Sequence, residues 1–124
     1  MNKKLIFISA LIIMGLTTFL GLNAQTGYQN INSTDAKALF DEQNIVFLDV
    51  RTPGEVAGGM IKGAKHIDVM GGNFAAQAQQ LDKSKTYVVY CRSGNRSSVA
   101  AKQMAGLGFD KLYNLSGGFG AWNG

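Results

Sequence analysis

The sequence predicts an α/β domain built on an open parallel sheet with helices on both faces. Short apolar runs of strand length occupy positions 45–50, 86–90 and 112–115, and segments with helical spacing or capping signals separate them. Runs that are apolar at nearly every residue suit strands covered on both faces, as in a parallel sheet. Because strands and helices alternate, we expect ligands to bind beyond the carboxyl ends of the strands.

The first half of the domain carries signals for a helix, a strand and a second helix. A helix is expected over positions 33–42, where apolar residues recur at helical spacing behind a Ser-Thr-Asp cap. The strand at 45–50 follows. Thr52 and Glu55 then have the spacing of a capping box, and the only proline, Pro53, fits the first position of a short helix that ends at the next Gly-Gly pair.

The second half repeats this alternation. Positions 64–68 predict a short strand, and positions 74–81 a helix that begins after a Gly-Gly break. The strand at 86–90 leads into a loop, and a helix is expected from Ser97 onward. The last strand, at 112–115, precedes another Gly-Gly pair that opens a terminal turn or helix.

The first two dozen residues predict a secretory signal peptide rather than part of the fold. A basic start at positions 1–4 precedes an apolar run over 5–22, and Ala24 is a small residue at the expected cleavage point. We therefore expect an exported, periplasmic protein with one domain over 25–124. Because the apolar run is long enough to span a bilayer, an uncleaved membrane anchor through residues 5–22 is the alternative.

The charge of the chain does not point to nucleic acid. The formal net charge is +4, and two of the lysines lie in the predicted leader. No run of lysine and arginine remains after it, so we expect no nucleic-acid surface.

Cys91 is the only cysteine, and its surroundings predict a reactive thiol. A lone cysteine cannot form an internal disulfide or a C-x-x-C redox pair. It follows a buried strand, and Arg92, Arg96 and the free amides of the next helix can stabilise a thiolate there. One cysteine and one histidine, His66, cannot complete a tetrahedral metal site, so neither a metal nor a cofactor is expected.

Two chemistries fit such a loop: sulfur transfer through a cysteine persulfide, or phosphoryl transfer through a cysteinyl phosphate. The loop from Cys91 to Arg96 holds six residues, whereas cysteine phosphatases use Cys-x5-Arg, one residue more, around a tetrahedral phosphate. A phosphatase also needs a carboxylic acid for the leaving oxygen. None lies in the loop, although Asp49 could approach from a neighbouring strand end.

The chain resembles the rhodanese-like (thiosulfate sulfurtransferase) domain. The segments that match in order are Leu48-Asp49-Val50-Arg51 with Glu55, Ile61-Lys62-Gly63-Ala64, Tyr90-Cys91-Arg92-Ser93-Gly94-Asn95-Arg96-Ser97, and Gly108-Phe109 through Leu115-Ser116-Gly117-Gly118 to Trp122. The resemblance implies a five-stranded parallel sheet and a persulfide on Cys91. It places the substrate-binding positions at Arg92, Ser93, Gly94, Asn95, Arg96 and Ser97. Met60 and His66 depart from the common family pattern of Gly-His-Ile and asparagine.

The expected function is therefore sulfur transfer from a small anionic donor such as thiosulfate to a thiol or cyanide through Cys91. Two alternatives remain: a persulfide carrier that serves a dedicated protein acceptor, or a cysteine phosphatase or arsenate-handling enzyme. Arg51 and Glu55 are interpreted as a structural ion pair at a helix start. His66 is interpreted as structural because it lies two strands from Cys91 in sequence order.

Overall fold

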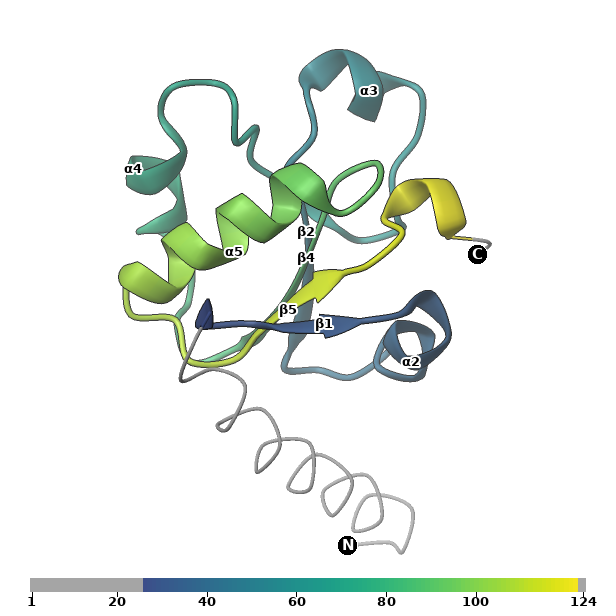
Figure 1. The fold of residues 1–124 in the computed structure, drawn as a ribbon, viewed down its shortest axis with the longest axis horizontal. Helices are drawn as coiled ribbons and strands as arrows, with labels where there is room; N and C mark the ends of the chain where they lie inside the picture. The colour runs from purple at the N-terminus through teal and green to yellow at the C-terminus, as the bar shows by residue number, and fades with distance from the viewer. Residues whose placement is uncertain (1–25, 123–124) are drawn as a thin grey trace, which may run out of the picture.

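The structure, a computed structural model, describes residues 26–122. Within that range five strands form one sheet in the order β1-β5-β4-β2-β3, and every neighbouring pair is parallel. The strands are β1 Gln29–Ile31, β2 Ile45–Asp49, β3 Lys65–His66, β4 Thr86–Tyr90 and β5 Leu112–Leu115. The predicted open parallel α/β fold is confirmed (Figure 1).

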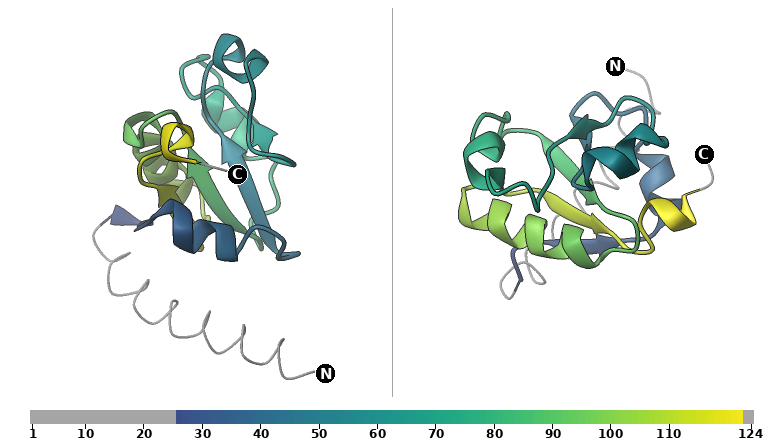
Figure 2. Two further views of the ribbon diagram at one scale, coloured as in Figure 1. Left: turned by 90° about the vertical axis from the view of Figure 1, so that its right-hand side faces the viewer. Right: turned by 90° about the horizontal axis from the view of Figure 1, so that it is seen from above.

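Helices connect these strands. They are α2 Ser33–Ala38, α3 Pro53–Ala57, α4 Phe74–Ala78 and α5 Asn95–Gly106, with a 3-10 turn η1 at Phe119–Ala121. Two core clusters show which faces of the sheet α2, α4, α5 and η1 cover. Helices α4 and α5 pack with residues such as Val89 in one cluster, whereas α2 and η1 pack with residues such as Val88 in the other. Figure 2 shows α2 well separated from α4 and α5.

Several element boundaries differ from the predicted ones. Helix α2 is capped by the Asn32 side chain, which accepts from the Asp35 amide at 2.8 Å, and it ends at Ala38 rather than near position 42. Helix α5 begins at Asn95, two residues before the predicted start, because Gly94 turns the chain with φ 109°. The predicted capping box of α3 is confirmed, with both Thr52 and Glu55 engaged.

Alternation along β4 decides where the cysteine points. Successive strand residues face opposite sides of a sheet. Val88 and Tyr90 lie in the cluster under α2 and η1, whereas Tyr87, Val89 and Cys91 lie in the cluster under α4 and α5. The strand therefore delivers the cysteine to the side of the sheet from which α5 departs.

Within residues 26–122, the structure holds no helix that is both long and apolar enough to cross a membrane. The predicted signal peptide and the alternative anchor through residues 5–22 lie outside the described residues.

Candidate active site

Cys91 lies at the carboxyl end of β4, in a loop that curls around its sulfur. The side chain is buried, and the Gly94 amide donates a hydrogen bond to Sγ at 3.1 Å. The positive φ of Gly94 makes this turn possible, because side-chain-bearing residues rarely adopt it. Helix α5 then starts at once, which brings the Ser97 hydroxyl to 3.3 Å from Sγ.

Hydrogen bonds make the thiol more acidic than usual. Burial by itself raises the pKa of Cys91, but hydrogen bonds from the Ser97 hydroxyl and from the amides of Ser97, Gly94 and Ser93 outweigh burial and hold that pKa below its ordinary value. Hydrogen bonds, rather than the arginine charges that the sequence suggested, account for the lower pKa of Cys91. The thiolate is the nucleophilic form of cysteine, so this loop favours the reactive state.

A buried amide network holds the loop from the neighbouring strand. Asn114 of β5 accepts from the Ser97 hydroxyl at 2.5 Å, and its Nδ2 donates to the Gly94 carbonyl at 3.2 Å and to Asn30 Oδ1 at 3.0 Å. Asn114 therefore contacts both residues that touch the sulfur. Sequence reasoning missed it, although a polar residue inside the apolar run of β5 is a usable signal for a buried hydrogen-bonding role.

The C-terminal turn η1 supports the loop from its other side. The Phe119 amide donates to the Cys91 carbonyl at 2.8 Å, and the Gly120 amide donates to the Arg92 carbonyl at 3.0 Å. Gly118 has φ 55°, and a Cβ there would come within 2.5 Å of the Cys91 and Arg92 backbones. Only glycine allows this close approach, so the Gly-Gly pair after β5 is part of how the loop is built.

The two loop arginines have different surroundings. Arg92 is exposed, and within residues 26–122 it makes no ion pair. Arg96 forms a two-point ion pair with Glu55 of α3, with Nη1–Oε1 2.7 Å and Nη2–Oε2 3.0 Å. Hydrogen bonding by Arg96 lowers the pKa of Glu55 to about 2, so this carboxylate stays charged across the physiological range.

The predicted Arg51–Glu55 pair is wrong. Arg51 instead pairs with Asp49 at 2.7 Å, with both side chains buried, and also donates to the Gly59 carbonyl at 2.6 Å. The guanidinium lies 4.3 Å from the centre of the Phe119 ring. Asp49 and Arg51 are only two residues apart at the end of β2, so this local pair forms in preference to a pair across the turn that precedes α3.

The remaining candidate residues lie apart from the sulfur or at the surface. His66 Nε2 lies 2.7 Å from the Arg51 carbonyl, on the edge strand β3, which is two strands from β4. Ser93 and Asn95 are exposed at the loop, where Ser93 contributes its amide and Asn95 begins α5. Across residues 26–122, no three His, Cys, Asp or Glu side chains gather as metal ligands would.

Fold and site together define a small α/β domain with a single activated cysteine at the carboxyl edge of its sheet. The chain belongs to the rhodanese-like domain family, which matches residues 32–124. This membership confirms the resemblance seen in the sequence.

Known relatives support the same class. The chain is 36% identical over 95 residues to a Pseudomonas fluorescens protein named thiosulfate sulfurtransferase GlpE, covering 77% of this chain and 84% of the relative. A rhodanese-related protein of Thermoplasma volcanium has a similar structure, with TM-score 0.68, 29% identity, and coverage of 77% of this chain and 90% of that one. These relatives place the chain among sulfurtransferase-like enzymes.

One structural neighbour carries a different description. A Rhodopseudomonas palustris protein described as of unknown function and a possible tyrosine phosphatase has TM-score 0.70 and 27% identity, with coverage of 86% of this chain and 87% of that one. The shared fold alone therefore does not choose between sulfur and phosphoryl chemistry, and the choice falls to the residues of the loop.

Proposed function

We propose that the protein transfers a sulfane sulfur from a small anionic donor such as thiosulfate to a thiol or cyanide, through a persulfide on Cys91. The observation that carries this proposal is the geometry at the sulfur. A thiol with lowered pKa receives hydrogen bonds from the Gly94 amide and the Ser97 hydroxyl, in a loop of six residues that ends at Arg96. The names of the relatives support the same chemistry.

The proposed transfer needs no external oxidant or reductant. In the first step the Cys91 thiolate attacks the outer sulfur of thiosulfate. The new bond joins Sγ to that sulfur, the sulfur–sulfur bond of the donor breaks, and its electron pair leaves with sulfite. In the second step an acceptor thiolate or cyanide attacks the terminal sulfur, and Cys91 leaves as the thiolate. No proton is exchanged at the reacting atoms, so no general base is required.

Asp49, the acid that sequence reasoning considered for phosphoryl transfer, is engaged elsewhere in the structure. Asp49 is fully buried and occupied by Arg51, which donates to both of its carboxylate oxygens. A buried carboxylate that is bonded to Arg51 through both oxygens is not available to a leaving group above Cys91. The acid that a cysteine phosphatase requires is therefore not supplied by Asp49.

The mass of the intact protein after incubation with thiosulfate tests the proposal. We expect a gain of one sulfur atom on the wild type, its removal by cyanide, and no gain on Cys91→Ser. Thiosulfate-to-cyanide transfer that persists in Cys91→Ser would refute the assignment. Multiple turnovers with cyanide support an enzyme, whereas loading without turnover points to a carrier for a protein acceptor. Rapid hydrolysis of an aryl phosphate would favour the phosphatase alternative.

We also propose that the protein is exported to the periplasm through residues 1–24. The basic start, the apolar run and Ala24 in the sequence support export. Sequencing the N-terminus of the protein recovered from cells tests it. A mature chain that begins at position 25 supports a free periplasmic protein, and a retained leader in the membrane fraction supports the anchor through residues 5–22.

A further inference from the structure

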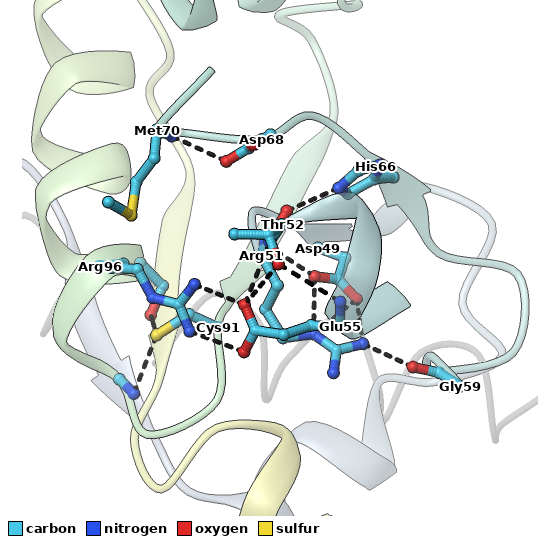
Figure 3. Close-up of polar contacts among 12 residues, drawn as sticks. Asp49, Arg51, Thr52, Glu55, Gly59, His66, Asp68, Met70, Cys91 and Arg96 are labelled. Atoms are coloured by element: carbon cyan, nitrogen blue, oxygen red, sulfur yellow. Dashed lines mark hydrogen bonds and ion pairs between the residues drawn. The ribbon is translucent and has the colours of Figure 1, made fainter. Parts of the chain in front are cut away.

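The ion pair between Glu55 and Arg96 reduces the positive charge available to a donor. The loop contains two arginines, which together would suit a dianion. The Glu55 carboxylate, however, bonds two nitrogens of the Arg96 guanidinium, and both side chains are more than two-thirds buried. Arg92 is then the loop arginine without a carboxylate partner among residues 26–122. Figure 3 shows the pair beside the Cys91 sulfur.

A second carboxylate adds to this effect. The charge of Asp68, in the loop after β3, acts on Arg96 together with those of Glu55 and Cys91. Asp68 itself accepts from the Met70 amide at 2.8 Å, and Met70 is 68% exposed. Asp68 forms no ion pair with Arg96, so it acts on that guanidinium only through its charge, whereas Glu55 binds it directly.

The positive charge left in the loop matters because the nucleophile is itself an anion. When a thiolate attacks a dianion, three negative charges come together, and positive groups must offset their repulsion. With Arg96 occupied, Arg92 and the loop amides remain for this purpose. A donor with a single negative charge meets less repulsion in the same loop.

We propose that Glu55 is a specificity-determining residue: by occupying Arg96 it disfavours dianionic donors such as thiosulfate and suits the loop to sulfane donors that carry one negative charge, such as organic thiosulfonates. This inference rests on the proposed sulfur transfer. In both cases the Cys91 thiolate bonds to the outer sulfur, and the donor's sulfur–sulfur bond breaks. The electron pair leaves with sulfite from thiosulfate, or with a sulfinate from a thiosulfonate.

Glu55→Gln tests the role of the charge with little change in shape. Glutamine can keep the capping box of α3, since its oxygen can accept from Thr52 as Oε1 of Glu55 does. It cannot form the ion pair, so Arg96 becomes available to the donor. Thr52→Ala is the matched control, because it removes the cap hydroxyl and its 3.1 Å bond to Glu55 Oε1 but keeps the charge of Glu55 and its ion pair with Arg96.

Thiosulfate and methanethiosulfonate are suitable probes, because a methyl group in the second replaces one charged oxygen of the first. The readout is kcat/KM for each donor with cyanide as the acceptor. In a two-step transfer this ratio reports the donor half-reaction. One unit of charge at a partly exposed site changes the rate with a monoanion by about threefold and with a dianion by about tenfold.

We expect Glu55→Gln to raise kcat/KM about tenfold for thiosulfate and about threefold for methanethiosulfonate, so that the preference moves about threefold toward the dianion. Thr52→Ala should leave the preference unchanged. An unchanged preference in Glu55→Gln, or an equal loss with both donors, would show that the pair only holds the loop in place and would overturn the inference. If neither donor loads wild-type Cys91, the proposed sulfur transfer itself fails, which is a distinguishable result.

Discussion

Replacing Ser97 with alanine should make the Cys91 thiol harder to ionise. The Ser97 hydroxyl is 3.3 Å from Sγ and 2.5 Å from Asn114 Oδ1, and its single proton can serve one of these acceptors at a time. Asn114 cannot turn its amide around without losing the bonds that Nδ2 donates. The hydroxyl can therefore donate to the sulfur only when it gives up Asn114, and this competition reduces its net effect on the thiolate.

The size of the effect follows from this competition. A hydrogen bond to a charged group contributes about 1.5–3 kcal/mol to its stabilisation. Because Asn114 competes for the same proton, we place the bond from Ser97 to the thiolate at the lower end of this range. About 1.4 kcal/mol corresponds to a tenfold change in the thiolate fraction. We expect iodoacetamide to alkylate Cys91 about tenfold more slowly in Ser97→Ala than in the wild type at pH values below the midpoint of thiol ionisation. On the alkaline plateau, where the thiol is fully ionised, the two rates should be nearly the same.

Ser98→Ala is the matched control for this experiment. Ser98 is the next residue of α5, and its hydroxyl donates to the Asn95 carbonyl at 2.7 Å without contacting the sulfur. Its alkylation profile should coincide with that of the wild type. If Ser97→Ala and Ser98→Ala share one midpoint, the hydroxyl of Ser97 does not stabilise the thiolate and the reasoning is refuted.

Three further predictions concern the scaffold. Gly118→Ala should abolish sulfur loading and lower the free energy of unfolding by about 2 kcal/mol or more, because the new Cβ would clash with the loop backbone. Gly106→Ala is the control: there is open space around Gly106, so the free energy of unfolding should change by about 1 kcal/mol at most. Asp49→Asn should lower the free energy of unfolding, measured in urea, by about 3 kcal/mol, since Arg51 would stay buried without its carboxylate partner. A decrease below about 1 kcal/mol would contradict this. The pKa of Glu55 is lowered to about 2 in the folded protein, so the charged carboxylate stabilises the fold above the usual carboxyl pKa range, and this stabilisation is lost as pH falls toward 2. The melting temperature of Glu55→Gln should therefore fall less over this acid range than that of the wild type.

Local signals were sufficient for the elements that carry the cysteine. Strand β4 spans Thr86–Tyr90 as predicted, because a short apolar run between turn residues is typical of a buried strand. Strand β5 likewise spans the predicted Leu112–Leu115. Strand β1, Gln29–Ile31, was not among the elements predicted along the chain. It is three residues long and largely polar, and its pairing with β5 at the sheet edge defines it.

Charge pairing was the least predictable property of the site. The spacing of Arg51 and Glu55 suggested one ion pair between them, whereas Arg51 pairs with Asp49 and Glu55 pairs with Arg96. Spacing predicts ion pairs well only within a regular helix, where the geometry between positions is known. Arg51 precedes α3 and is buried beside the end of β2, so helix spacing does not apply to it.

The amino-acid sequence was enough to predict the nucleophile, the length of its loop and the alternation that forms the sheet, because each is a property of a continuous segment. Cys91 and Arg96 belong to one such segment, as do the apolar runs of the central strands. The groups that surround the sulfur could be identified only from the folded structure. Glu55 is 41 positions from Arg96, and Asn114 is 17 positions from Ser97. Parallel strands bring their carboxyl ends to one edge of a sheet, so residues distant in the chain set the charge and the hydrogen bonding of the loop.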